Sequence, residues 1–417
     1  MVPDPINDIL EEHIDEATFL WLQRAGAVDQ PNYGPTQFAD LDERLEAHID
    51  GLLVAGEAGW SLAEAALDNE GPEDFFPATV LAIETADDRL AGIIARAESA
   101  ADVVPGVISA LGWVAPTFLA GRVKSLLIDA SPFQQMLGLS ACDVHRKDPG
   151  VVLDRFLVSP DARVRSRAVR TAGELGRDDL MPQLLRALMD DKHEVRYWAS
   201  RSGVLLGDRG RMLDELTARA LKPGARQLPA LQLTMQALKI EQCHDLLQQL
   251  AEVPDAARLQ IIGAGMAGSV HYVPWLLEQM VSDPLARLAA EAFVNITGAD
   301  FNLDQLEAMP PDGFEDGPTE DPADENVEVP EDVALPWPDL ARVESWWQKN
   351  ASRFSPSTRY FLGAPVSTES CIGVLKTGFQ RQRIAAAQYL CLLNPGMPLF
   401  NTSAPARRQQ ALLATST

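Results

Sequence analysis

Cysteine, basic residues and long apolar runs are all scarce in this sequence. Its four cysteines are spread widely over the 417 residues: Cys142, Cys243, Cys371 and Cys391. Such spacing offers no disulfide framework and is typical of a reducing compartment. No stretch approaches the roughly 18 apolar residues of a transmembrane helix. The N-terminus carries Asp4, Asp8 and Glu11 where a signal peptide needs positive charge. We therefore expect a cytoplasmic protein.

The scarcity of lysine and arginine limits the functions to be expected. The sequence has 35 basic and 60 acidic residues, and its formal net charge is -25. This balance argues against a general binder of nucleic acid or of anionic membranes. The sequence also lacks G-x-S-x-G, a phosphate-binding loop and H-E-x-x-H. We therefore expect no enzymatic activity, no cofactor and no bound metal.

What the sequence does contain is an internal repeat. Residues 161–176, DARVRSRAVRTAGELG, are echoed by residues 191–207, DKHEVRYWASRSGVLLG. Apolar or small residues recur in the first segment at the spacing of one helix face: Val164, Ala168, Ala172 and Leu175. A shift of 31 positions reaches the same stripe in the second segment: Val195, Ala199, Gly203 and Leu206.

The repeat continues through the middle of the chain. Turn signals are followed by single arginines at intervals of 29 to 32 residues: Arg165, Arg196, Arg226, Arg258 and Arg287. A near-constant period of this size indicates stacked supersecondary units. Helical periodicity between the turns, without strand-like alternation, predicts an all-α chain folded as an α-solenoid.

This pattern resembles HEAT repeats, an armadillo-type arrangement of paired helices. The resemblance implies that aspartates and arginines form a ladder, which links neighbouring repeats through bonds from side chains to the backbone. The residues that match this role are Asp161, Arg165, Asp191, Arg196, Asp255, Arg258, Asp283 and Arg287. Gly224 replaces the aspartate ahead of Arg226, so we expect a weaker ladder there.

Composition divides the chain into four predicted parts. Residues 1–69 are predicted to form an N-terminal helical cap, and residues 70–299 the array of repeats. Residues 300–338 are predicted to be an acidic extended linker, because they include no lysine or arginine and their prolines prevent a long helix. Residues 339–417 are predicted to form a small C-terminal helical region, with its last dozen residues loose.

Three tryptophans after the acidic stretch form a candidate partner or docking patch. Prolines flank Trp337 and fix an extended backbone there. Trp346 and Trp347 follow on a predicted helix. The indoles either form an exposed patch for a partner or bury the C-terminal region against the last repeat. We favour burial.

Two apparent chemical motifs have a structural interpretation. The segment IIGAGMAG at 261–268 satisfies G-x-G-x-x-G, but a dinucleotide site needs a preceding strand, and helical repeats flank this segment. Cys142 and His145 have a metal-ligand spacing on a helix. Cys243 and His244 form a second loose pair, yet no C-x-x-C completes a zinc site. We interpret these residues as core cysteines and capping histidines.

Arginines between residues 155 and 226 are the best remaining indication of a binding surface. In an acidic chain they form either an anion-binding surface or a set of ladder and solvated side chains. The candidates for an anion or partner surface are Arg163, Arg167, Arg170 and Arg201. Spacing puts Arg163 and Arg167, or Arg167 and Arg170, on one helix face. We also hypothesise that the acidic residues 300–332 fold back on this surface.

Short blocks along nearly the whole chain carry a closer resemblance. In order, they are EEHIDEATFLW, LDERLEAHIDGL, SALGW, VHRKDPG, ITGADF, LPWPD and QRQR. With these blocks the chain resembles an uncharacterised family of bacterial HEAT-repeat proteins found beside type VI secretion spike and effector genes. The resemblance implies a cytoplasmic accessory protein of type VI secretion. It brings no known activity, so no catalytic residue is carried over.

Two functions of different classes remain open. The first is a protein–protein interaction scaffold, an adaptor or chaperone-like protein that holds a type VI effector or spike component before loading. The alternative is a nucleic-acid-binding or DNA-modifying HEAT-like protein with an arginine-lined concave face, which the net charge disfavours. A repeat-type lyase or other enzyme would need a pocket that the sequence does not reveal. The first two functions differ in whether the arginines are free of internal carboxylate partners.

Overall fold

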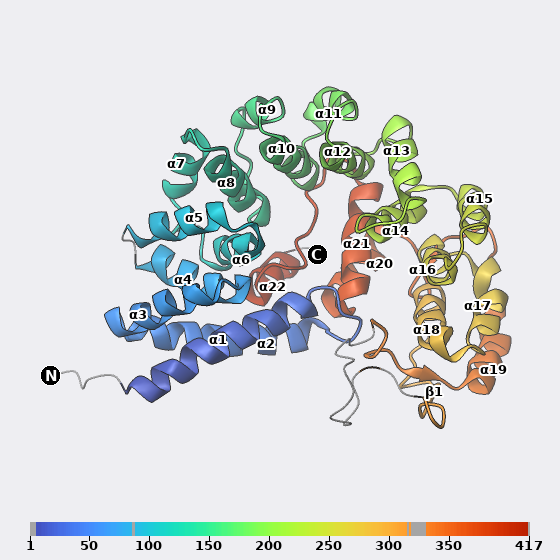
Figure 1. Cartoon of the computed structure of the whole chain (residues 1–417). Helices are drawn as coiled ribbons and strands as arrows, with labels where there is room; N and C mark the ends of the chain where they lie inside the picture. Colours follow the sequence, from blue (N-terminus) through green and yellow to red (C-terminus); the bar gives the residue numbers. More distant parts are fainter. Residues whose placement is uncertain (1–5, 86–87, 315–316, 318–330, 416–417) are drawn as a thin grey trace. The chain divides into compact units, whose positions relative to one another are not determined.

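The computed structural model describes residues 6–85, 88–314, 317 and 331–415 (Figure 1). These residues are mostly helical, which confirms the predicted all-α class. The strands among them are two antiparallel pairs of two residues each. No helix in the described ranges combines the length and the hydrophobicity needed to cross a bilayer.

By packing, the chain divides into two compact units. The first unit comprises Met1–Gly207, Leu375–Ala387 and Asn394–Thr417. The second unit comprises Asp208–Val374 and Gln388–Leu393. The division differs from the four parts predicted along the sequence. It falls inside the predicted array, and the C-terminal region contributes residues to both units.

The first unit contains the helices of the N-terminal half together with the last helix of the chain. They are α1 (Asn7–Ala27), α2 (Pro35–Val54), α3 (Glu57–Ala66), α4 (Pro72–Glu84), α5 (Arg89–Ser99), α6 (Val104–Trp113), α7 (Arg122–Ile128), α8 (Pro132–Val144), α9 (Val152–Phe156), α10 (Ala162–Glu174), α11 (Met181–Ala187), α12 (His193–Leu205) and α22 (Ala406–Ala414), with the 3-10 turns η1 (Leu67–Asn69), η2 (Ala101–Val103) and η3 (Asp178–Leu180). From α4 to α12, each even-numbered helix packs on the next even-numbered helix. Each odd-numbered helix from α3 to α11 packs on the helix that follows it.

The second unit shows the same order of packing. Its elements are α13 (Arg211–Ala220), α14 (Gln227–Ala237), α15 (Ile240–Ala251), α16 (Ala257–Ala267), η4 (Val270–Tyr272), α17 (Val273–Gln279), α18 (Asp283–Thr297), β1 (Glu307–Ala308), β2 (Trp337–Pro338), α19 (Leu340–Asn350), η5 (Ala351–Arg353), β3 (Tyr360–Phe361) and β4 (Ala364–Pro365). Helix α14 packs on α16 and α16 on α18, while α13, α15 and α17 each pack on the following helix. Two helices have residues in both units: α20 (Thr368–Thr377) and α21 (Gln380–Leu393).

The repeated sequence forms α10 and α12. All eight residues of the two predicted stripes are buried: Val164, Ala168, Ala172, Leu175, Val195, Ala199, Gly203 and Leu206. Asp161 begins α10, because its carboxylate accepts hydrogen bonds from the backbone N–H groups of Arg163 and Val164. Gly173 lets the two helices approach closely, since a Cβ atom there would lie 2.3 Å from Ser202 Oγ.

The glycines of IIGAGMAG serve the same purpose. The segment lies in α16, as the helical interpretation predicts, and its last residue Gly268 ends that helix. A Cβ atom on Gly265 would lie 2.9 Å from the Cα atom of Ala292 in α18. The glycine therefore permits contact between two helix backbones, which is a packing role.

Arginines of the first unit link α10 to the turn that precedes α12. The Arg165 guanidinium contacts Asp190 at 2.7 Å and Asp191 at 3.5 Å, and it donates to the carbonyls of Ser159 and Pro160. Hydrogen bonds from Arg165 lower the pKa of Asp190 to about 2. The side chain of Arg196 donates to the carbonyls of Asp190 and Asp191 in the same turn.

The ladder positions of the second unit make different contacts. Arg226 is the N-cap residue of α14. Asp255 lies in a turn with a φ of 58°, and Asp283 is the first residue of α18. Arg258 pairs with Asp332 at 2.6 Å and with Glu331 at 3.2 Å. Arg287 stacks on Trp337, with 4.8 Å between its Cζ atom and the ring centre. Arg258 and Arg287 thus contact residues 331–337, which follow the repeats in sequence.

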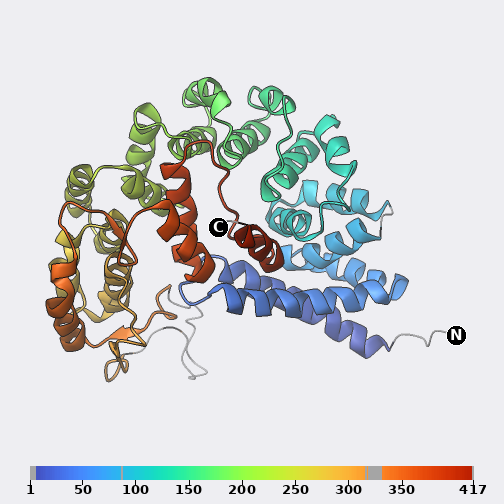
Figure 2. The same cartoon turned by 180° about the vertical axis from the view of Figure 1, so that it is seen from behind.

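Two predictions for the C-terminal third need correction. Strands β1 and β2 pair, with Glu307 opposite Pro338, so the described ends of the predicted linker lie side by side. The last dozen residues are not loose, because α22 forms there and packs on α2 in the first unit (Figures 1 and 2). Nothing in the local sequence pattern signals this contact, because it depends on residues more than 300 positions away.

We predict that Arg165→Ala lowers the free energy of unfolding by about 1 to 2 kcal/mol, because it removes charge-assisted hydrogen bonds between α10 and the turn before α12. The matched control is Arg163→Ala, since Arg163 is exposed and pairs only with Asp161 of its own turn among the described residues. We expect the control to change stability by less than about 0.5 kcal/mol. Urea unfolding of both variants measures the difference, and equal losses would contradict a linking role for Arg165.

Candidate functional site

The strongest concentration of charge in the first unit is a buried pair of carboxylates. Asp143 lies near the end of α8 and is 1% exposed, and Glu174 is the last residue of α10 and is 3% exposed. A hydrogen bond joins the two side chains. Two buried carboxylates at this distance cannot both be ionised without nearby cations or a shared proton.

Four arginines surround this carboxylate pair, and we call the six residues the buried charge cluster. The contacts are Arg146 to Asp143 at 3.0 Å, Arg146 to Glu174 at 3.0 Å, Arg167 to Asp143 at 3.3 Å, Arg170 to Glu174 at 2.8 Å and Arg201 to Glu174 at 3.6 Å. The arginines come from the residues after α8, from α10 and from α12. The cluster therefore connects three successive even-numbered helices.

The two carboxylates respond differently to this environment. Burial and the neighbouring charge of Glu174 raise the pKa of Asp143 to about 6. Burial alone would also raise the pKa of Glu174, but the charges of Arg170, Arg146 and Arg201 hold it well below its usual range. Glu174 is thus the ionised member of the pair, and Asp143 is the member that takes up a proton in mild acid.

Aromatic rings on α12 cover two of the arginines. The Cζ atom of Arg170 lies 4.6 Å from the centre of the Trp198 ring, and that of Arg201 lies 5.4 Å away. The indole N–H of Trp198 donates to Glu194 in the same helix. Cation–π stacking of this kind holds guanidinium groups in place and shields them from water.

The C-terminal segment crosses the ends of these helices, and we call residues 394–405 the C-terminal strap. Leu399 donates its backbone N–H to the carbonyl of Glu174 at 2.9 Å, and its own carbonyl accepts from Arg146 at 2.7 Å. Asn401 donates to the carbonyl of Val144 at 2.9 Å. Gly176, with a φ of 74°, leaves room for the strap, because a Cβ atom there would lie 2.2 Å from a strap carbonyl.

These contacts place each candidate of the predicted anion surface. Arg167, Arg170 and Arg201 belong to the buried charge cluster, so internal carboxylates are their partners. Arg163 is exposed and pairs with Asp161 at 3.1 Å. The four residues therefore do not form one free surface: three stabilise the contact between helices, and the fourth lies at the start of α10.

The tryptophans lie against other side chains of the second unit. Trp346 packs edge-on to Phe293 of α18, with 5.7 Å between ring centres, and Trp347 lies 6.4 Å from the same ring. Trp337 packs on Phe314 at 4.7 Å and on Arg287. All three indoles are half-buried. These contacts agree with a docking role for the patch.

The cysteine and histidine positions show packing contacts. Cys142 and Cys243 are buried, and burial raises the pKa of both thiols to about 11. His145 lies 2.7 Å from the carbonyl of Leu111, and burial lowers its pKa to about 4. Within the described ranges, no three residues of the His, Cys, Asp and Glu types group closely enough to hold a metal ion.

Most of the predicted acidic fold-back lies outside the described residues. Residues 315–316 and 318–330 are not described. At the described end of the segment, Glu331 and Asp332 pair with Arg258 of α16. The acids that can be placed thus contact an arginine of the second unit, where the hypothesis named arginines of α10 and α12.

Sequence reasoning missed the acids of the buried charge cluster. Asp143 follows the apolar run MLGLSAC of α8, and Glu174 stands directly beside the stripe residue Leu175. A charged residue within an apolar helix face is a usable signal, because burial of an unpaired carboxylate is costly. The signal identifies neither the partner arginines nor the strap, which come from distant parts of the chain.

We predict that Asp143→Asn changes how stability depends on pH. The pKa of Asp143 is higher in the folded state (about 6) than the ordinary value of 3.8, so between these values the folded protein binds more protons than the unfolded chain. The wild type should gain about 1 kcal/mol relative to the variant when pH falls from about 7 to 5. Urea unfolding at both pH values measures this gain, and parallel pH profiles would exclude a raised pKa at Asp143.

We further predict that Glu174→Gln destabilises the first unit by about 3 kcal/mol or more, because four guanidinium groups then surround a single buried carboxylate. Glu64→Gln, on the exposed side of α3, serves as the control and should change stability by less than about 0.5 kcal/mol. Thermal unfolding measures both. A wild-type melting temperature in Glu174→Gln would show that the ion pairs add nothing net to stability.

Comparison with known proteins adds no relative to this geometry. No family model matches the chain, and no curated protein matches it.

Proposed function

We propose that the protein is a protein–protein interaction scaffold of the cytoplasm, an adaptor or chaperone-like accessory protein of type VI secretion that acts without catalysis. In this proposal its paired helices are HEAT-like repeats of an α-solenoid. The partner is a type VI effector or spike component, which the protein holds before loading. Stacked repeats suit this task because they present a long surface without needing a cofactor.

The order of helix packing supports the repeat interpretation. In both units each long helix packs on the long helix two positions later, with a second helix between them in sequence. Arg165 of α10 reaches Asp190 in the next turn, and Arg196 of α12 donates to the carbonyls of that turn. These are the contacts expected of a ladder between neighbouring repeats.

A row of exposed apolar side chains is the observation that carries the proposed binding role. Ile128, Val158 and Met189 are 66%, 74% and 76% exposed, and they stand 30 and 31 residues apart. Each lies at or just after the end of a short helix, ahead of α8, α10 and α12 respectively. A single exposed apolar residue needs no explanation, but recurrence at one repeat position gives an ordered line, which we call the apolar row.

The apolar row leaves the C-terminal strap undisturbed. Val158 lies just ahead of the first turn of α10, while the strap contacts Glu174 at the other end of the same helix. A helix of 13 residues is about 20 Å long at 1.5 Å per residue. A partner that docks on the apolar row therefore does not need to displace the strap or expose the buried charge cluster.

The nucleic-acid alternative has weaker support. A phosphate-binding face needs guanidinium groups that are free to approach the backbone of a nucleic acid. Arg167, Arg170 and Arg201 contact Asp143 or Glu174. No observation in the described residues favours catalysis on a nucleic acid, so we do not develop a second function.

We predict that replacing the whole apolar row, as Ile128→Glu with Val158→Glu and Met189→Glu, lowers partner capture at least roughly tenfold, because charged side chains would replace apolar contacts. The matched control is Val151→Glu, since Val151 is 85% exposed and lies outside the row. Pull-down of each full-length variant from native lysate, with nuclease treatment and mass spectrometry, measures the enrichment of spike and effector proteins.

Two results would contradict the proposal. Recovery of nucleic acid, or the loss of every partner after nuclease treatment, would favour the nucleic-acid alternative. Equal capture by the triple variant and the wild type would show that binding does not use the apolar row. Circular dichroism of the triple variant should match the wild type, since the three side chains are exposed.

A further inference from the structure

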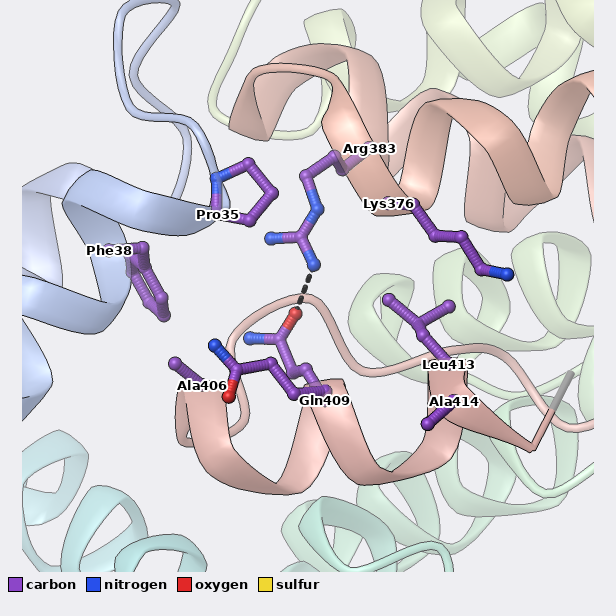
Figure 3. Close-up of a pocket in the computed structure, with 9 residues that line it drawn as sticks. Pro35, Phe38, Lys376, Arg383, Ala406, Gln409, Leu413 and Ala414 are labelled. Atoms are coloured by element: carbon purple, nitrogen blue, oxygen red, sulfur yellow. Dashed lines mark hydrogen bonds between the residues drawn. The ribbon is translucent and has the colours of Figure 1, made fainter.

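A cavity of about 290 Å³ lies in the first unit where the C-terminal helix meets the start of α2 (Figure 3). Its lining combines Phe38 of α2, Lys376 of α20, Arg383 of α21, and Gln409 and Leu413 of α22. Phe38, Arg383 and Gln409 are buried and form the deep part, while Lys376 is exposed. The lining is thus apolar with two cationic side chains, a composition common in small-molecule sites.

Arg383 is the chemically distinctive group in this cavity. It is 2% exposed, and it donates to the carbonyl of Leu375 and to the side-chain oxygens of Gln380 and Gln409. All three acceptors are neutral. Among the described residues, no carboxylate lies within ion-pair distance of Arg383. Burial lowers the pKa of its guanidinium to about 10, so the group is charged at neutral pH and its charge is not neutralised.

Other buried arginines of the first unit are neutralised by acids. Arg24 pairs with Asp42 at 2.5 Å, and Arg170 pairs with Glu174 at 2.8 Å. Arg383 differs from these because amide oxygens satisfy part of its hydrogen-bonding capacity without cancelling its charge. The three printed bonds use three of the five guanidinium N–H groups. One N–H remains on each terminal nitrogen, and in Figure 3 these nitrogens lie among the lining side chains.

We propose that this cavity binds a small organic carboxylate with an apolar body. The carboxylate would lie against Arg383 with Lys376 nearby, and the apolar body would lie against Phe38 and Leu413. A planar guanidinium suits a carboxylate, because two parallel N–H groups match its two oxygens. The volume is at the small end of ligand sites, which range from roughly 300 to 1,000 Å³. The ligand is therefore of the size of benzoate or hexanoate.

Such a ligand would connect three helices that are far apart in sequence. It would contact α2, α21 and α22 together, so it would bind the folded arrangement and not a chain in which α22 has detached. Binding that is selective for the folded state raises the melting temperature. This inference does not depend on the proposed partner: the cavity can bind a carboxylate whether or not the apolar row captures a protein.

The test uses the full-length protein with benzoate and hexanoate as probes, and with benzamide and hexanamide as neutral controls of the same shape. We expect at least one carboxylate to raise the melting temperature and to bind with a Kd of about 1 mM or tighter by calorimetry. The matching amide should bind at least roughly tenfold more weakly, because it cannot neutralise the guanidinium. No binding by either carboxylate, or equal binding of amide and carboxylate, would overturn the proposal.

Variants on α22 test the location. Ala414 is exposed and lines the cavity, whereas Ala411 is exposed on the same helix but does not. Ala414→Trp should weaken carboxylate binding at least roughly tenfold by filling the cavity, and Ala411→Trp should leave it within about twofold. If Ala414→Trp binds the carboxylate as tightly as the wild type, the ligand lies elsewhere and the proposal is wrong.

A charge variant tests the electrostatic part without disturbing the buried guanidinium. Lys376→Gln removes the exposed cation and should weaken carboxylate binding roughly threefold to tenfold, with no effect on the amides. Lys124→Gln, on the exposed side of α7, is the control and should bind as the wild type does. An equal change for carboxylates and amides in Lys376→Gln would contradict an anion site.

Discussion

The burial of Asp143 and Glu174 between adjacent helices is the constraint on which the first unit depends. Two carboxylates that face each other away from water need cations or a proton. The arginines that supply the cations come from different elements, so α8, α10 and α12 must all be in place for the charges to balance. Arg146 also donates to the carbonyl of Leu399, which joins the C-terminal strap to the same cluster. One electrostatic requirement thus fixes the contact between three helices and the path of a segment more than 200 residues further along the chain.

The sequence predicts the parts of this arrangement that depend on local pattern. The stripe from Val164 to Leu175 repeats after 31 positions, and both copies are buried because helix periodicity puts their members on one face. The boundaries near Asp161 and Gly176 follow from capping chemistry. The charge cluster could not be predicted in the same way, because Asp143 and Arg201 meet only through packing, and a charged residue carries no mark of its partner. The strap and α22 were missed for a related reason: their contacts are with residues far away in sequence.

Arginine illustrates why composition alone is a poor guide to a binding surface. Arg165 links a helix to a turn, Arg170 neutralises a buried acid, and Arg383 lies in a cavity beside neutral amides. The residue type is the same in each case, but the free energy available for a ligand differs. A guanidinium that already contacts a carboxylate must lose that contact to bind an external anion. Arg383 has no such contact among the described residues, so an incoming carboxylate would replace no ion pair. Charge balance around each arginine, and not the number of arginines, decides where an anion can bind.

The C-terminal segment determines which surfaces of the first unit are available. The strap lies along the C-terminal ends of the even-numbered helices, and α22 closes one side of the cavity that contains Arg383. Both surfaces are therefore partly made by the chain's own terminus, and any partner that used them would have to compete with bonds such as that from Ala406 to Asp42. The turns that precede α8, α10 and α12 carry no such cover from the strap. Exposed apolar side chains recur at those turns, at the opposite ends of the helices from the strap. A protein that must hold a partner and later release it gains from this separation, because docking and release at the turns leave the buried charges untouched.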